Sequence, residues 1–344
     1  MPEENNLIPA IGGPLGRSDL TVPAFGLGTG PLGDLFGRIP EPVAAETFAA
    51  AWAEGVRLFD TAAWYGRGLS EHRAGAFLRP RPRDSYVLTT KVGRTLFRPA
   101  DPARFDRRPF VGGLNFEVKF DYSYDGIMRS YEQALQRLGV DTVDALAIHD
   151  LDTGFHGDAF DGHRATLLET GVRALEELKR AGDIRAIGMG FNLAPELEQF
   201  VGEIDLDYAL VAHPYTLLDQ GSLHTGMAAC QARGTSVIIG APFASGILVT
   251  GSGRNATYAY GAAPEAVQRK VQRIERVCAA HDVPLAAAAL QFVLAHPSVR
   301  AVIPGATEPA HVKSNVASLR LDIPASFWTD LRTEGLVDPD SPLP

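Results

Sequence analysis

Eight short runs of apolar and β-branched residues recur along the 344-residue chain, and this repetition constrains the fold more than any other feature. Runs of this kind predict strands, and most of them are continuously hydrophobic, as is typical of parallel strands that are covered on both faces. The predicted strands begin near Val22, Val56, Tyr86, Asp144, Ile184, Tyr208, Ser236 and Arg300.

Helical patterns separate these runs, for example in residues 42–55, 124–139, 167–182 and 194–204. Pro42 stands near the start of the first pattern, where a missing N–H costs nothing, and Gly139 and Gly182 stand just past helix ends. Eight β-then-α units predict an α/β protein with a (β/α)8 TIM barrel in one domain, residues 1–344.

A doubly wound sheet is the main alternative to a barrel. It needs fewer strands and more often shows a glycine-rich turn after the first strand. The segment GLGTG (26–30) matches such a turn only weakly, and the full G-x-G-x-x-G pattern is absent. The barrel is therefore the preferred architecture.

Composition narrows the function classes. With 45% hydrophobic and 21% charged residues, the chain is typical of a soluble globular protein. A net charge of −9 without basic clusters argues against nucleic acid or an anionic membrane as a partner. No signal peptide and no membrane-length apolar stretch is seen. Cys230 and Cys278 are too few for a disulfide framework, so we expect a cytoplasmic protein.

Two long loops are predicted after the third and seventh strands, following Lys91 and Pro242, each of about 30 residues. Loops that follow strands lie on the C-terminal face of a barrel, where active sites are found. The first loop is expected to be a substrate lid, or otherwise a surface excursion packed on its own aromatic cluster. Its aromatic residues are Phe97, Phe105, Phe110, Phe116 and Phe120.

Four polar residues are predicted to meet on that face. Asp60, Lys91 and His149 end the second, third and fourth strands, and Tyr65 follows on the loop after Asp60. Each alone has an ordinary structural explanation, such as a helix cap or a packing residue. Their coincidence at one face of one barrel favours a functional site.

The chemistry of this set is acid/base chemistry. A buried Asp60 and Lys91 would compensate each other's desolvation. A lysine close to a phenol lowers the phenol's pKa from about 10, so Tyr65 could exchange a proton with a carbinol or carbonyl oxygen. His149 could orient the same oxygen. No His, Cys or Asp spacing indicates a metal site.

Three segments together resemble the aldo-keto reductases, and the resemblance runs from about Pro23 to Leu321. It implies that Asp60, Tyr65, Lys91 and His149 form the family's catalytic tetrad, with Tyr65 as the acid/base. The segments are GVRLFDTAAWYGRGLSEHRAG (55–75), LTTKVG (88–93) and VDALAIHDLD (143–152).

The resemblance also implies a nicotinamide cofactor extended across the barrel mouth. In IGMGFN (187–192), Gly190 replaces the family's usual serine, so Asn192 is expected to hold the carboxamide. APFASGILVTG (241–251) resembles the pyrophosphate segment and IPGATEPAHVKSN (303–315) the adenosine segment. The implied cofactor residues are Gly28, Thr29, Asp60, Asn192, Pro242, Ser245, Gly246, Leu248, Gly305, His311 and Asn315.

Two departures from the family pattern matter. Gly305 and His311 stand where NADPH-specific members carry a Lys and an Arg that clamp the 2′-phosphate. NAD is therefore expected to bind better than NADP, although Lys313 could reach a 2′-phosphate. Residues 239–241 read Ile-Gly-Ala where many members stack a tyrosine on the nicotinamide.

HPYTLLDQ (213–220) and GAPFASGIL (240–248) resemble one branch of the family, the D-threo-aldose (L-fucose) 1-dehydrogenases, L-galactose dehydrogenases and pyridoxal 4-dehydrogenase. The resemblance implies NAD-dependent oxidation of a cyclic hemiacetal, an aldose such as L-fucose, L-galactose or D-arabinose, to a lactone. Substrate contacts are then expected from Trp64, Tyr65, Phe97 and His149.

Three alternatives stay open. Arg94 and Arg98 in the first long loop would equally suit pyridoxal, whose phenolate oxygen is anionic. The chain could instead be an NADPH-dependent carbonyl reductase, or a regulatory subunit that binds nicotinamide without turnover. The sequence does not indicate an oligomeric state.

Overall fold

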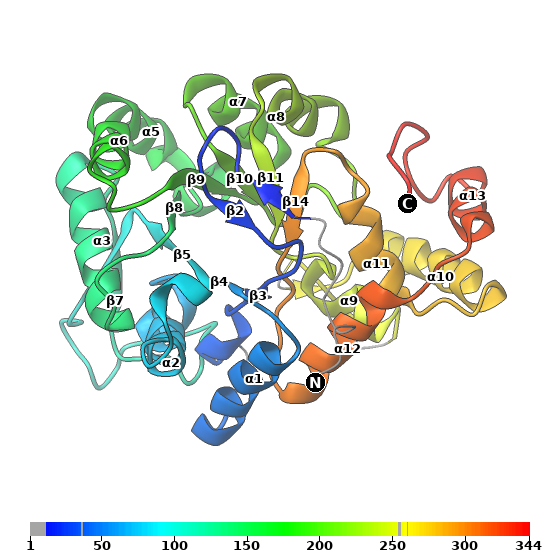
Figure 1. The fold of residues 1–344 in the computed structure, drawn as a ribbon, viewed down its shortest axis with the longest axis horizontal. Coiled ribbons are helices and arrows are strands. Elements are labelled where there is room, and N and C mark those ends of the chain that lie inside the picture. The colour runs from blue at the N-terminus through cyan, green and yellow to red at the C-terminus, as the bar shows by residue number, and fades with distance from the viewer. Residues whose placement is uncertain (1–11, 36, 254–255, 260) are drawn as a thin grey trace.

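Eight parallel strands form one curved sheet in the computed structural model, which describes residues 12–35, 37–253, 256–259 and 261–344 (Figure 1). Hydrogen-bonded neighbours follow one another along the chain, and parallel bridges from Phe25 to Val302 and from Gly28 to Gly305 join the first strand to the last. The (β/α)8 barrel is confirmed, because a doubly wound sheet would stay open. The strands are β3 (Leu27–Gly28), β4 (Leu58–Asp60), β5 (Val87–Val92), β8 (Ala145–Ile148), β9 (Ala186–Phe191), β10 (Tyr208–Val211), β11 (Ser236–Ile239) and β14 (Val299–Val302).

The first barrel strand starts later than the sequence predicts. Residues near Val22 belong instead to β2 (Thr21–Val22), which forms an antiparallel hairpin with β1 (Gly13–Pro14). Leu15 and Leu20 of this hairpin are fully buried and join the apolar cluster inside the barrel. The hairpin therefore covers the N-terminal end of the barrel, opposite the face where the predicted site lies.

A helix follows each barrel strand and packs on the outside of the sheet (Figure 1). Gly139 and Gly182 cap two of these helices with φ of 65° and 83°, as predicted. Apolar residues on the inner faces of the helices and the outer faces of the strands form the main core. The eight helices are α1 (Glu41–Ala53), α2 (Leu69–Leu78), α3 (Tyr124–Leu138), α6 (Val172–Ala181), α7 (Ala194–Glu203), α8 (Ala228–Arg233), α11 (Leu285–Leu294) and α12 (Pro309–Arg320).

Additional helices extend this basic pattern. Short helices α4 (Thr153–His156) and α5 (Phe160–Thr166) precede α6, and α10 (Glu265–Ala280) precedes α11 and packs against α13 (Ala325–Thr333). In the described part of the chain, no single helix has the length and apolar character to cross a membrane. Only α10 and α11 taken together meet that test, with a bend of 100° between them.

Both predicted long loops lie at the C-terminal ends of strands, and both contain more secondary structure than expected. The first is built on an antiparallel hairpin, β6 (Arg94–Phe97) with β7 (Glu117–Phe120), joined by residues 98–116. The second contains α9 (Ile247–Thr250) and a small ladder of β12 (Thr257–Tyr258) with β13 (Gly261–Ala262). The register of the first hairpin places Arg94 next to the barrel and Phe97 away from it.

Candidate functional site

The four predicted polar residues lie together at the C-terminal ends of β4, β5 and β8. Asp60 is the last residue of β4, Lys91 is the fifth residue of β5, and His149 directly follows β8. Tyr65 begins a short 3-10 turn, Tyr65–Gly68, that follows β4. Since β4, β5 and β8 are parallel neighbours, their C-terminal ends meet at one edge, and this places residues distant in sequence side by side.

Asp60 and Lys91 form a fully hydrogen-bonded buried pair. Lys91 Nζ lies 2.6 Å from Asp60 Oδ2 and donates to the Thr61 carbonyl at 2.9 Å. Thr89 Oγ1 donates to the other Asp60 oxygen at 2.7 Å. Both side chains are almost completely buried, and the carboxylate keeps the pKa of Lys91 above its usual value despite that burial. Lys91 is therefore a fixed positive charge.

Tyr65 lies against this fixed charge. Lys91 Nζ is 4.8 Å from the centroid of the Tyr65 ring. Burial raises the pKa of the Tyr65 phenol, and the charge of Lys91 opposes that rise without cancelling it. The expectation that the pKa falls below its ordinary value is therefore wrong for this structure: Lys91 limits the cost of forming the phenolate but does not make the phenolate the resting state.

His149 is neutral and has one uncommitted nitrogen. Its ring meets the Tyr65 ring edge-on, with 5.8 Å between centroids. Burial, Arg94 and Lys91 all lower the pKa of His149 well below its usual value. Nε2 lies 3.2 Å from Asp150 Oδ2, whereas buried Nδ1 has no hydrogen-bond partner among the described residues. With the ring proton on Nε2, that N–H can donate to a substrate oxygen on the side of the ring that faces Asp150, whereas Nδ1 is closed off from solvent.

Asp150 connects His149 to two residues that the sequence did not place at the tetrad. Arg94 Nη2 lies 2.9 Å from Asp150 Oδ2, and Asn192 Nδ2 donates to Asp150 Oδ1 at 2.9 Å and to Asp152 Oδ2 at 3.2 Å. Asp150 has a φ of 40°, a left-handed conformation that is strained for a residue other than glycine. The only sequence signal for this acid is its position directly after His149.

The two aromatic residues predicted to contact substrate lie in different surroundings. The Trp64 ring is 5.2 Å from the Arg94 guanidinium carbon and meets Phe110 edge-on at 5.2 Å. It therefore lies beside the tetrad. The Phe97 ring contacts the ammonium of Lys119 at 4.5 Å, on the outer part of the hairpin. A role in substrate binding has structural support for Trp64 and has none for Phe97.

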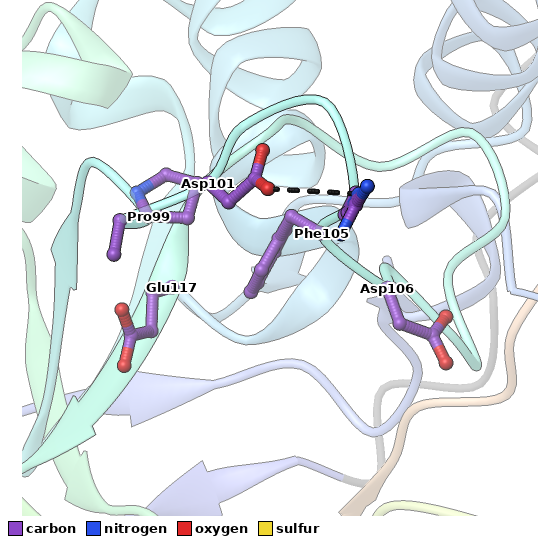
Figure 2. A pocket seen from close by; sticks show the side chains of 7 residues that line it. Pro99, Asp101, Phe105, Asp106 and Glu117 are labelled. Atoms are coloured by element: carbon purple, nitrogen blue, oxygen red, sulfur yellow. Dashed lines mark ion pairs between the residues drawn. The ribbon is translucent and has the colours of Figure 1, made fainter.

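The segment between β6 and β7 is fastened over the turn that carries Tyr65. Leu114 N donates to the Gly66 carbonyl at 2.9 Å, and the Arg67 guanidinium donates to the Phe116 carbonyl and lies 4.8 Å from the Phe105 ring. The segment also forms an open surface cavity of about 470 Å³. Figure 2 shows this cavity, which is lined by Pro99, Ala100, Asp101, Arg104, Phe105, Asp106 and Glu117 and contains no tetrad residue.

These contacts favour the lid over the self-packed excursion. Arg67 joins the loop to the turn that carries Tyr65, because its guanidinium also lies 5.0 Å from the Trp64 ring. Phe110 of the loop is buried against Trp64 rather than only against its own neighbours. The loop therefore covers one side of the tetrad.

Three predicted cofactor residues near β3 also have structural roles. A Cβ on Gly28 would lie 2.6 Å from the Ile303 carbonyl oxygen, and a Cβ on Gly305 would lie 2.6 Å from Pro31 Cγ. Thr29 Oγ1 donates to the Asp60 carbonyl at 2.8 Å and is fully buried. Packing alone therefore accounts for these residue types, whether or not they also meet a cofactor.

The predicted pyrophosphate segment has an unusual backbone. Ala244, Ser245 and Gly246 all adopt left-handed φ, at 47°, 61° and 99°. The amides of Gly246 and Leu248 both donate to the Phe243 carbonyl, at 2.9 and 3.2 Å. At Gly246 an added Cβ would meet no atom closer than 3.9 Å, so a ligand can approach the backbone there. Because the amides of Gly246 and Leu248 already donate to Phe243, what this segment offers an anionic group is the close approach at Gly246.

The predicted adenosine segment lies on and before α12. His311 is exposed, contacts Thr307 Oγ1 at 3.0 Å, and lies 3.6 Å from Glu308 Oε1. Asn315, also on α12, is buried. His311, which the family pattern assigns to the 2′-phosphate, thus lies close to a carboxylate, which would disfavour a second negative charge.

The comparisons with known proteins agree with this geometry. Residues 24–333 match the family model described as the aldo/keto reductase family. The chain is 40% identical over 332 residues to pyridoxal 4-dehydrogenase of Microbacterium luteolum, covering 94% of this chain and 97% of that protein. It is 37% identical to D-threo-aldose 1-dehydrogenase of Pseudomonas sp, covering 92% and 95%. The solved holo form of aldo-keto reductase AKR11C1 from Bacillus halodurans superposes with a TM-score of 0.72 at 25% identity, covering 94% and 95%.

Proposed function

The chain belongs to the aldo/keto reductase family and is an oxidoreductase, and from this premise we propose that it oxidises a cyclic hemiacetal to a lactone with NAD. The leading substrate is an aldose such as L-fucose, L-galactose or D-arabinose, oxidised at the anomeric carbon. The observation that carries the proposal is the fixed positive charge of Lys91 beside the Tyr65 ring, 4.8 Å from its centroid, with neutral His149 next to it.

The protein's own residues handle the proton in this proposal. Deprotonated Tyr65 takes the proton of the anomeric hydroxyl while the carbon gives up its hydrogen as hydride, so that the C–O bond becomes the lactone carbonyl. Lys91, held by Asp60, stabilises the phenolate, and His149 orients the hydroxyl through Nε2. Bound NAD would supply the hydride acceptor.

The cofactor would be held along the barrel mouth. We propose that Asn192 lies near the carboxamide and that the curled backbone of residues 242–248 faces the pyrophosphate. Gly28, Thr29 and Gly305 would lie near the nicotinamide ribose and the strand ends, and His311 and Asn315 near the adenosine. The same proposal treats residues 1–344 as one domain in the cytoplasm, with small-molecule partners only.

NAD is expected to bind at least about tenfold more tightly than NADP, because a 2′-phosphate would lack a charge-assisted partner and would meet Glu308 beside His311. Calorimetry with both cofactors measures the two dissociation constants. Glu308→Arg should narrow the ratio by improving NADP binding, while Glu265→Arg, at an exposed position at the start of α10, serves as the charge-matched control. A wild-type protein that prefers NADP would contradict the argument.

The rate of oxidation is expected to rise with pH. Burial raises the pKa of Tyr65, so the phenolate is a minor species at pH 7 and grows about tenfold per pH unit. Lys91 stays charged because its pKa is also raised, and His149 stays neutral because its pKa is lowered. Between pH 7 and 9, kcat/KM should therefore follow a single ascending limb. A bell-shaped or flat profile would assign the proton to another group.

The substrate assignment is tested by offering L-fucose, L-galactose, D-arabinose and pyridoxal separately and following the appearance of NADH. At least one of the three sugars should be oxidised, with the lactone identified by mass spectrometry. Pyridoxal is the second candidate, because it also forms a cyclic hemiacetal and the 40% identical relative is named for it. If the protein binds NAD but oxidises none of the four compounds, the regulatory subunit is favoured. If it reduces aldehydes with NADPH, the carbonyl reductase is favoured.

A further inference from the structure

Arg94 is a buried cation whose hydrogen-bonding capacity is only partly used. Its side chain is 1% exposed, and Nη2 lies 2.9 Å from Asp150 Oδ2. Nε and Nη1 are buried without a hydrogen-bond partner among the described residues. The Tyr122 hydroxyl also lies beside this guanidinium. A buried donor without a partner costs about 1–3 kcal/mol, and more on a charged group, so a ligand that accepts from the remaining N–H groups would be stabilised here.

Aromatic rings surround the Arg94 guanidinium. The rings of Trp64 and Phe120 are both 5.2 Å from its central carbon, and the ring of Phe155 is 4.7 Å away. Phe120 and Phe155 are among the exposed large apolar residues of the molecule, at 37% and 46%. The guanidinium therefore lies among aromatic rings, two of which reach the protein surface.

Asp150 places this group next to the reacting centre. The same carboxylate oxygen, Oδ2, lies 2.9 Å from Arg94 and 3.2 Å from His149 Nε2. His149 in turn meets the Tyr65 ring. A substrate whose reacting hydroxyl lies at His149 and Tyr65 would thus carry its neighbouring substituent toward Arg94.

The local charge favours a neutral substituent. Asp150 already balances Arg94, and Asp152 adds a second carboxylate through Asn192, while Lys91 is balanced by Asp60. An anionic oxygen would enter a region with one more negative than positive charge. A hydroxyl can accept from Arg94 and donate to Asp150 at once, and the aromatic rings suit the C–H face of a sugar ring.

We infer that Arg94, oriented by Asp150, binds the hydroxyl on the ring carbon next to the reacting carbon of a neutral polyhydroxylated lactol. The inference rests on the proposed function and narrows it, because it selects aldoses over pyridoxal, which has no hydroxyl on the neighbouring carbon and carries an anionic phenolate one carbon further on. It makes Arg94 a substrate-binding residue that sets specificity.

The decisive experiment compares L-fucose with 2-deoxy-L-fucose in the wild type and in Arg94→Met. Removal of either the hydroxyl or the guanidinium should lower kcat/KM by about 10- to 100-fold, and removal of both should lower it no further. Independent, multiplying effects would show that the two groups do not meet and would overturn the inference. Arg104→Met, an exposed arginine of the same loop, should leave both sugars unaffected.

Arg94→Lys is a second variant that distinguishes a loss of substrate binding from a loss of folding. The lysine keeps a positive charge for Asp150, so the thermal midpoint should stay near that of the wild type. It cannot reproduce the planar set of donors, so the preference for L-fucose over its 2-deoxy form should still fall about tenfold or more. A lysine variant with the full wild-type preference would overturn the inference.

Binding without turnover separates this inference from the proposed function. Tyr65→Phe protein loaded with NAD is titrated with L-fucose or pyridoxal while tryptophan fluorescence is followed, since Trp64 lies next to Arg94. If the sugar binds to Tyr65→Phe but not to the double variant Tyr65→Phe/Arg94→Met, the inference is supported. This holds even if the wild type oxidises no lactol, and in that case only the proposed function fails. Sugar binding unaffected by Arg94→Met, or binding of pyridoxal alone, overturns the inference.

Discussion

Replacing Tyr65 by Phe is expected to lower kcat by about 10²- to 10⁴-fold while leaving the affinity for NAD unchanged. The ring would still fill its place against Lys91 and His149, and only the oxygen that carries the proton would be lost. The size of the loss is that of a single general acid/base group. Steady-state rates of NADH formation and calorimetric titration with NAD measure the two quantities.

Tyr124→Phe is the matched control for this change. The Tyr124 hydroxyl donates to Glu177 at 2.6 Å, in a contact between α3 and α6 on the outside of the barrel. Its loss should leave both kcat and the thermal midpoint close to those of the wild type. Wild-type turnover in Tyr65→Phe would remove Tyr65 from the mechanism, and a parallel loss of NAD affinity would show that the ring had moved.

The barrel could be predicted because its signals are local. Each parallel strand is a continuous apolar run, and each helix has its own periodicity and glycine cap, as at Gly139 and Gly182. The start of the first strand was misplaced for the opposite reason. Val22 has the composition of a strand, and only the contacts of Leu15 and Leu20 with the barrel interior show that it belongs to the closing hairpin.

The tetrad could also be predicted, because in a parallel barrel the ends of neighbouring strands must meet. Arg94 was found only as a loop residue, since its importance depends on a contact with Asp150 across 56 positions of sequence. The direction of the Tyr65 pKa was wrong because burial, which opposes the effect of Lys91, has no sequence signature. The substrate contact expected for Phe97 stays a prediction, since the structure shows only that its ring lies against Lys119.

The ion pair of Asp60 and Lys91 contributes to both stability and catalysis. Lys91→Met is therefore expected to lower both the free energy of unfolding and kcat. The change removes the cation from a carboxylate that is 3% exposed, so the free energy of unfolding should fall by about 3–5 kcal/mol. It also removes the charge that opposes the raised pKa of Tyr65, so kcat at pH 7 should fall by about 10²-fold or more. Urea unfolding and initial rates measure the two effects.

The double variant Asp60→Asn/Lys91→Met separates the two roles of the pair. With the carboxylate neutralised, no buried charge is left unpaired, and the carbonyl oxygen of the new side-chain amide can still accept from Thr89. Most of the lost stability should therefore return, to within about 1–2 kcal/mol of the wild type, while kcat should stay as low as in Lys91→Met. A double variant as unstable as the single one would mean that Lys91 stabilises the barrel through packing instead of charge. A double variant with restored turnover would mean that the phenol of Tyr65 needs no neighbouring cation, and the proton route proposed for this site would have to be abandoned.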